Sequence, residues 1–192
     1  MEVEYTRDEM RQLWKRLRWL EPLRSDATVV RSDGTDLDAL AESEMRVWYL
    51  SLLHEAPLEM LALTELASQA SVRRLRGDGT QGWFPAGAAL LEVTVPRGVI
   101  RLARLVMQGQ AMGLDIVEDP SDPRWRLGLN RFRRGMAPAA ALWLRSSSVI
   151  LLPAPADGSL PAVASLHAVA DTGPEIYRFQ EQALASIGGR GE

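Results

Sequence analysis

Residue types that carry out acid–base or nucleophilic chemistry are scarce in this sequence of 192 residues. Histidine supplies most general acid–base catalysis near neutral pH, and neither His54 nor His167 has a second histidine at ligand spacing. The sequence has no cysteine, which excludes thiolate nucleophiles and Cys-based metal sites. It also has no serine-hydrolase elbow, zinc-protease motif or P-loop. We therefore expect no catalytic residue, no cofactor and no metal, although carboxylate pairs that meet only in space stay open.

Three aspartates resemble the start of a calcium loop. An EF-hand loop has ligands at its first, third and fifth positions and glycine at the sixth. Among Asp33, Asp36 and Asp38, however, Gly34 directly follows the first aspartate, so the spacing fails. We interpret these carboxylates as turn and N-cap residues.

The segment GDGTQG at residues 77–82 formally matches the dinucleotide fingerprint GxGxxG. That fingerprint requires a strand before it and a helix after it. Pro85 follows the segment closely and is unsuited to a helix start of that type. We therefore expect no nucleotide site here.

Arginine dominates the basic residues, because only Lys15 among the 22 is a lysine. Guanidinium groups suit interface ion pairs and phosphates. Residues 63–76 superficially resemble a helix-turn-helix with Val72 near the start of a reading helix, but Gly77 would end that helix early. The arginines that we expect at an interface are Arg73, Arg74, Arg131, Arg133 and Arg134. A DNA-binding regulator that uses residues 72–76 and 131–134 is the alternative to an interface role.

Charge is unevenly distributed along the chain. Residues 1–70 hold 8 basic and 14 acidic side chains, net −6, and residues 71–150 hold 12 and 6, net +6. Residues 151–192 hold 2 and 5, net −3. A basic middle between acidic ends can bind a polyanion, or it can meet the acidic region of a neighbouring copy. The second option predicts a head-to-tail homo-oligomer.

Apolar spacing predicts helices at both ends of the chain. Thr6 and Glu9 have the spacing of a capping box and predict a helix over 6–20. Trp14 lies on its apolar stripe and Trp19 lies off it, and we expect both to dock a partner. Further helices are expected over 36–55 and 174–187, and residues 57–70 could continue as a helix.

Between these helices, short apolar runs separated by Gly and Pro predict strands. The expected strands cover residues 90–95, 99–107, 114–118, 140–144, 149–152 and 162–170. Segregation of helices from strands indicates an α+β fold with an antiparallel sheet. We divide the chain into a helical part (1–70), a β-rich part (71–170) and a C-terminal helix with its tail (171–192). The first residues are acidic and polar, so we expect no secretory signal. The sequence lacks a long apolar run, so we expect no membrane-spanning helix.

Residues 82–155 carry a family resemblance. Trp83-Phe84 precedes LLEVTVPRGVIRLARLVMQG, which is followed by the Pro/Asp turn at 119–123, the Asn-Arg-Phe-Arg segment at 130–133 and VILLPAP at 149–155. This order resembles the head-to-tail adaptor proteins of short-tailed phages and prophages, also called tail tubular or gatekeeper proteins. The resemblance implies a non-catalytic ring beneath a portal or tail protein, with non-specific DNA contact. The protein would then move from the cytoplasm to the virion.

Overall fold

The computed structural model describes residues 1–18, 36–79, 86–110, 112–130, 138, 140–145, 147–155 and 157–188. Helices and sheets are mixed, which confirms the α+β class. The chain forms two compact units. The terminal unit contains residues 1–62 and 170–192, and the strand-rich unit contains residues 63–169. Both ends of the chain therefore belong to the same unit.

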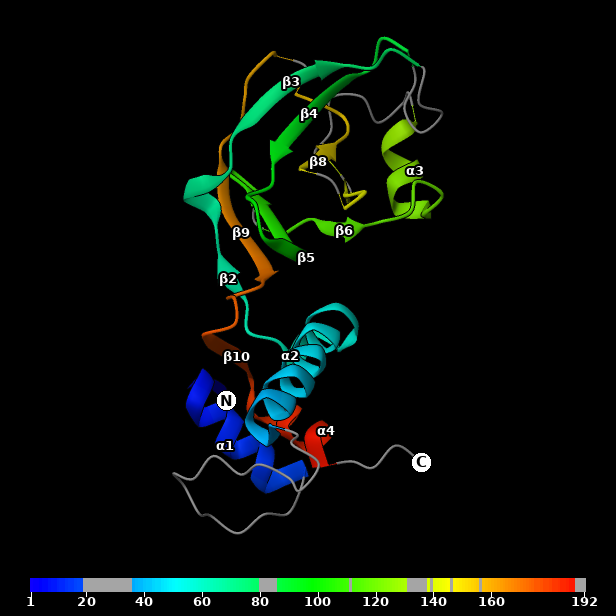
Figure 1. Ribbon diagram of the computed structural model, residues 1–192. Coiled ribbons are helices and arrows are strands. Elements are labelled where there is room, and N and C mark those ends of the chain that lie inside the picture. The colour runs from blue at the N-terminus through cyan, green and yellow to red at the C-terminus, as the bar shows by residue number, and fades with distance from the viewer. Residues whose placement is uncertain are drawn as a thin grey trace. The chain divides into compact units, whose positions relative to one another are not determined.

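The terminal unit combines a two-stranded sheet with helices (Figure 1). Strand β1 (Glu2–Thr6) pairs antiparallel with β10 (Ile176–Gln180). The longer helices are α1 (Arg7–Arg18) and α2 (Leu37–Glu55). Short helical turns follow as η1 (Leu58–Met60), η4 (Glu181–Leu184) and α4 (Ala185–Gly188).

Side-chain caps define where α1 and α2 begin. The Thr6 backbone N–H donates to Glu9 Oε2 at 2.9 Å, and the Glu9 N–H donates to Thr6 Oγ1 at 3.4 Å, so the expected capping box is confirmed. Asp36 accepts hydrogen bonds from the backbone N–H groups of Asp38 and Ala39, at 2.9 and 3.2 Å. The interpretation of Asp36 as an N-cap is therefore also confirmed.

The helix expected over 174–187 is wrong over its first half. Residues 176–180 form β10, and only η4 and α4 follow as helical turns. Tyr177 and Phe179 alternate with half-exposed neighbours, so a strand directs both aromatic rings into the core. The partner strand β1 was not predicted, because its acidic residues mask a similar alternation.

The helix considered over 57–70 is also wrong. The segment forms η1, then β2 (Thr64–Glu65) and η2 (Ala67–Gln69). Leu61 forms an isolated bridge with Phe179, and Thr64 pairs with Ala168. These non-local pairings override the local helix propensity of the segment.

Among its described residues, the strand-rich unit contains two sheets, the helix α3 and the short turn η2 (Figure 1). One sheet has the strand order β3-β4-β8-β7-β6, and the other has the order β2-β9-β5. In the larger sheet β6 and β7 pair in parallel, whereas β3–β4, β4–β8 and β7–β8 are antiparallel. The elements are β3 (Val72–Arg76), β4 (Ala89–Thr94), β5 (Val99–Met107), β6 (Asp115–Val117), α3 (Pro123–Leu129), β7 (Ala140–Leu142), β8 (Ser148–Leu151) and β9 (Val163–Ala170). The six strands expected between 90 and 170 are confirmed within a few residues, whereas α3 was not expected.

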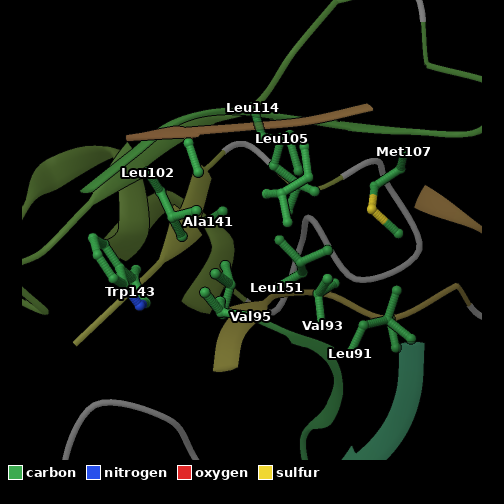
Figure 2. Packing of buried hydrophobic residues seen from close by; sticks show 14 residues of the cluster. Leu91, Val93, Val95, Leu102, Leu105, Met107, Leu114, Ala141, Trp143 and Leu151 are labelled. Carbon is green, nitrogen blue, oxygen red and sulfur yellow. The ribbon is translucent and has the colours of Figure 1, made fainter. Parts of the chain in front are cut away.

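Both faces of the five-stranded sheet are covered by apolar side chains. On one face, Leu91 and Val93 of β4 pack in a cluster with Leu105 and Met107 of β5 (Figure 2). On the other face, Leu90 packs in a second cluster with Trp125 of α3. Leu114 donates to the Leu105 carbonyl at 2.7 Å and so connects β5 to the chain entering β6. The two sheets thus enclose a shared core, and β3 lies at an edge of the larger sheet.

Candidate interaction surfaces

The Trp14 side chain is buried in the terminal unit. It is only 4% exposed, and its Nε1 donates to Glu44 Oε2 at 3.2 Å. Its ring centroid lies 5.8 Å from that of Trp48, which in turn makes an edge contact with Phe179. Trp14 therefore stabilises the core of its own unit and leaves little surface for a partner. Trp19, the second tryptophan of the predicted docking surface, lies outside the described residues.

The basic face of α1 is occupied by α2. Arg11 Nη1 lies 2.7 Å from Glu42 Oε1, and Lys15 pairs with Asp38. Arg7 also bonds to Glu42, and this hydrogen bond is the main reason why the pKa of Glu42 lies below its usual value. The four-residue steps from Arg7 to Lys15 were the sequence signal for this contact, because they place the cations on one helix face.

Three exposed arginines lie on β3, which is an edge strand of the larger sheet in the strand-rich unit. Residues 72–76 are a strand, so the suggestion of a reading helix there is wrong. Arg73, Arg74 and Arg76 are all exposed, whereas Val72 and Leu75 are partly buried. Two of the expected interface residues, Arg73 and Arg74, are therefore adjacent on one edge strand. Arg131, Arg133 and Arg134 lie outside the described residues.

Two of these arginines make contacts within the unit. Arg73 pairs with Glu92, which is directly opposite on β4, and this bond is the first cause of the lowered pKa of Glu92. Arg73 is nevertheless 69% exposed. Arg74 donates to the Pro155 carbonyl. These contacts orient the side chains of Arg73 and Arg74, which remain exposed to solvent.

The backbone of β3 exposes hydrogen-bonding groups at alternate residues. The Ser71 carbonyl accepts from Thr94, and the Gly77 N–H donates to the Ala88 carbonyl. Because bonding sides alternate in an antiparallel pair, odd-numbered residues bond to β4 and the N–H and C=O groups of Arg74 and Arg76 point outward. Among the described strands, β3 has a partner on one side only.

A second edge with the opposite charge is present in the terminal unit. Met1 accepts from Glu181, and Arg7 donates to Glu175, so the odd-numbered residues of β1 bond to β10. The backbone groups of Glu2 and Glu4 therefore point away from β10. Both glutamates are exposed, and β1 too has one partner among the described strands.

The structure places the first glycines of the 77–82 motif next to a strand, and the two histidines on a helix and a strand. Gly77 and Gly79 follow β3, and the next described element is strand β4, whereas residues 80–82 lie outside the described residues. A dinucleotide fingerprint requires a helix after the glycines, and none is described between β3 and β4. His54 is exposed near the end of α2, and His167 is opposite Glu65 in the β2–β9 pair.

A shallow pocket of about 170 Å³ opens on the terminal unit and is lined by Tyr5, Glu9, Gln12, Leu13 and Arg16. Thr6 already bonds to the Glu9 carboxylate and lowers its pKa, chiefly through the backbone N–H. The pocket thus holds an ionised capping residue. Within the described ranges, no three His, Asp or Glu side chains converge to bind a metal.

Among the helices that the structure describes, none is both long and apolar enough to span a membrane. Comparisons of the chain with protein-family models, curated proteins and solved structures gave no match. The two oppositely charged strand edges are therefore the features on which a function can be argued.

Proposed function

We propose that this chain is a non-catalytic structural protein that self-associates head to tail, in the manner of the phage head-to-tail adaptors that its sequence resembles. The observation that carries the proposal is the segregation of charge between the two compact units. The terminal unit holds 10 basic and 17 acidic side chains, net −7, and the strand-rich unit holds 12 and 8, net +4. Opposite charges on two units of one chain favour contact between the acidic unit of one copy and the basic unit of the next.

Such a contact is heterologous, because it joins two different surfaces. A heterologous contact repeats from copy to copy and forms a closed ring when the rotation closes. A ring is the assembly that the resemblance implies. The virion role and a portal or tail partner are part of this proposal.

Sedimentation velocity of the full chain at two ionic strengths tests the proposal. At about 0.01 M salt the Debye length is about 30 Å, and at about 1 M it is about 3 Å. We expect concentration-dependent association at low salt that weakens at high salt. A single monomeric species at low salt, over the whole accessible concentration range, would contradict the proposal.

DNA binding is the second candidate, and the net charge of +4 on the strand-rich unit favours it. Binding to phosphates would weaken steeply with salt, with a slope of about −0.9 per phosphate contact in a double-logarithmic plot. A duplex gel-shift titration at several salt concentrations separates the two functions. Retention of duplex DNA by chain that is monomeric at low salt would favour the DNA-binding alternative.

A further inference from the structure

We propose that the outer edge of β1 in one copy pairs antiparallel with the outer edge of β3 in a second copy. This inference rests on the proposed head-to-tail assembly and names the elements that make the contact. Strand addition of this kind joins two sheets through main-chain hydrogen bonds, and the side chains select the partner. Both strands have a partner on one side only among the described residues.

The backbone hydrogen bonds of the two edges match in one register. Glu2 and Glu4 on β1, and Arg74 and Arg76 on β3, are residues whose N–H and C=O groups point outward. They have the same two-residue spacing, so an antiparallel pairing places Glu2 opposite Arg76 and Glu4 opposite Arg74. Each of these pairs can exchange two backbone hydrogen bonds. The N–H of Thr6 is already bound by Glu9, which ends the pairing at that residue.

The same register places opposite charges across the new contact. Glu2 meets Arg76 and Glu4 meets Arg74, and such cross-strand pairs are attractive. The two glutamates already form ion pairs with Arg178, with N–O distances of 2.6 Å to Glu2 and 3.2 Å to Glu4. A carboxylate has about four acceptor sites and can therefore accept a second guanidinium.

The other face of the joined sheet is compatible as well. Val3 lies between the two glutamates and would be opposite Leu75, and both side chains are partly buried within their own units. Tyr5 would be opposite Arg73, where an aromatic ring and a guanidinium attract one another. A shift of register by one residue would bring inward-bonding residues to the edge and lose every new hydrogen bond.

Charge also disfavours the competing pairings. Two β3 edges would place arginines against arginines, and two β1 edges would place glutamates against glutamates. Like charges opposite one another destabilise a strand pair, and charged edges are a known protection against unspecific strand addition. The β1–β3 pair joins different surfaces, so it is heterologous and can build a ring.

Charge reversal on each edge provides the test. The first variant is Arg74→Glu/Arg76→Glu. The second is Glu2→Arg/Glu4→Arg/Arg178→Glu, in which the last substitution preserves the ion pairs inside the terminal unit. In sedimentation velocity at low salt, we expect each variant alone to lose roughly tenfold or more in apparent association constant, because two attractive cross-strand pairs become repulsive. An equimolar mixture of the two variants should associate again, because every edge then has an oppositely charged partner.

The matched control is Arg97→Glu/Arg104→Glu, which makes the same charge change at two exposed arginines that are not part of β3. Both variants lower the charge of the strand-rich unit by the same amount, so both weaken its long-range attraction equally. At the same ionic strength the control should therefore lose clearly less association than Arg74→Glu/Arg76→Glu, which also places like charges across the β1–β3 pair. Far-UV circular dichroism and thermal unfolding establish that each variant is folded.

The outcomes separate the two levels of the proposal. Self-association of the unmodified chain that Arg74→Glu/Arg76→Glu leaves intact would overturn the β1–β3 pairing and leave head-to-tail assembly standing. Folded variants that are both monomeric and do not associate when mixed would also overturn the pairing. A monomeric unmodified chain at low salt overturns the assembly itself and the pairing with it.

Discussion

Arg46 on α2 is paired with Asp171, which directly precedes the segment leading into β10. The Arg46 Nη1 group donates to Asp171 Oδ1 at 2.9 Å, although 125 positions separate the two residues. Arg46 also donates to the Gly173 carbonyl at 3.1 Å, and Asp171 accepts from the Gly173 N–H at 2.9 Å. The contact thus joins the two chain segments of the terminal unit and fixes the turn before β10.

Replacement of Arg46 by Met should destabilise the terminal unit. The guanidinium and the carboxylate are both partly buried, with exposed fractions of 26% and 28%, so the substitution leaves Asp171 without its charged partner. We expect a loss of about 1–2 kcal/mol in the free energy of unfolding, measured by urea denaturation. The matched control is Arg18→Met on the exposed side of α1. Equal effects of the two substitutions would contradict the assigned role of Arg46.

Replacement of Trp14 by Ala should be more damaging, because this side chain is core rather than docking surface. Truncation of a buried aromatic residue removes its packing and leaves a cavity, at a cost of about 3–5 kcal/mol. Thermal unfolding followed by near-UV circular dichroism measures the change. Val47→Ala is the control, since Val47 is 66% exposed and its truncation should cost no more than about 0.5 kcal/mol.

Deletion of residues 1–20 follows from the same burial. Had the first helix been only a docking arm, the deletion would leave a folded core. The deletion instead removes β1, α1 and the buried side chains of Met10, Leu13 and Trp14. We therefore expect the terminal unit to unfold. Limited proteolysis of the shortened chain checks this, and a protected terminal unit would show that α1 is dispensable.

Local signals in the sequence predicted the beginnings of α1 and α2. The capping hydrogen bonds of Thr6, Glu9 and Asp36 span at most three residues along the chain. The spacing of these residues in the sequence is therefore enough to predict the caps. Helix α3 had a comparable signal, because Asp122 caps it and Pro123 occupies its first turn. In the sequence, this Asp-Pro pair is interpreted only as part of the Pro/Asp turn at 119–123.

Non-local pairing explains what the sequence did not predict. Strands β1 and β10 pair residues as distant as Glu2 and Gln180, and neither strand is stable alone. The identification of the outer edges of β1 and β3 also depends on non-local strand pairing. The Arg-rich composition of residues 72–76 was visible, but the exposure of Arg74 and Arg76 at a sheet edge follows only from the position of β3 beside β4. Burial of Trp14 likewise required α2 to be placed against α1.

Acidic pH should destabilise the terminal unit through its paired carboxylates. The pKa of Glu42 is lowered first by its hydrogen bond from Arg7, and that of Asp171 first by its hydrogen bond from Arg46. A carboxyl whose pKa is lower in the folded state stabilises that state above its unfolded pKa, which is about 4. This contribution is lost as pH falls from about 4 through the lower folded values. Urea midpoints should therefore change little between about pH 7 and 5 and fall below about pH 4.

The double variant Glu42→Gln/Asp171→Asn tests the assignment of this acid sensitivity. It lacks both titrating groups, so it should be less stable at neutral pH and show a shallower decline on acidification. Denaturation curves at matched pH values compare it with the unmodified chain. Parallel pH profiles would show that other carboxyl groups cause the acid transition.

Gly128 in α3 should resist replacement by alanine, although alanine favours helices. A Cβ atom at this position would lie 2.8 Å from the Leu152 carbonyl oxygen, a backbone atom of the chain that follows β8. Helix propensity alone would stabilise the variant by about 1 kcal/mol, whereas overpacking against a backbone costs about 1–3 kcal/mol. Because the clash must move main chain rather than a flexible side-chain tip, we expect the steric cost to win and the melting temperature to fall. Leu127→Ala, on the same helix and 49% exposed, should change stability much less. A higher melting temperature for Gly128→Ala would mean that α3 can move away from Leu152, and that its contact with the sheet does not require glycine.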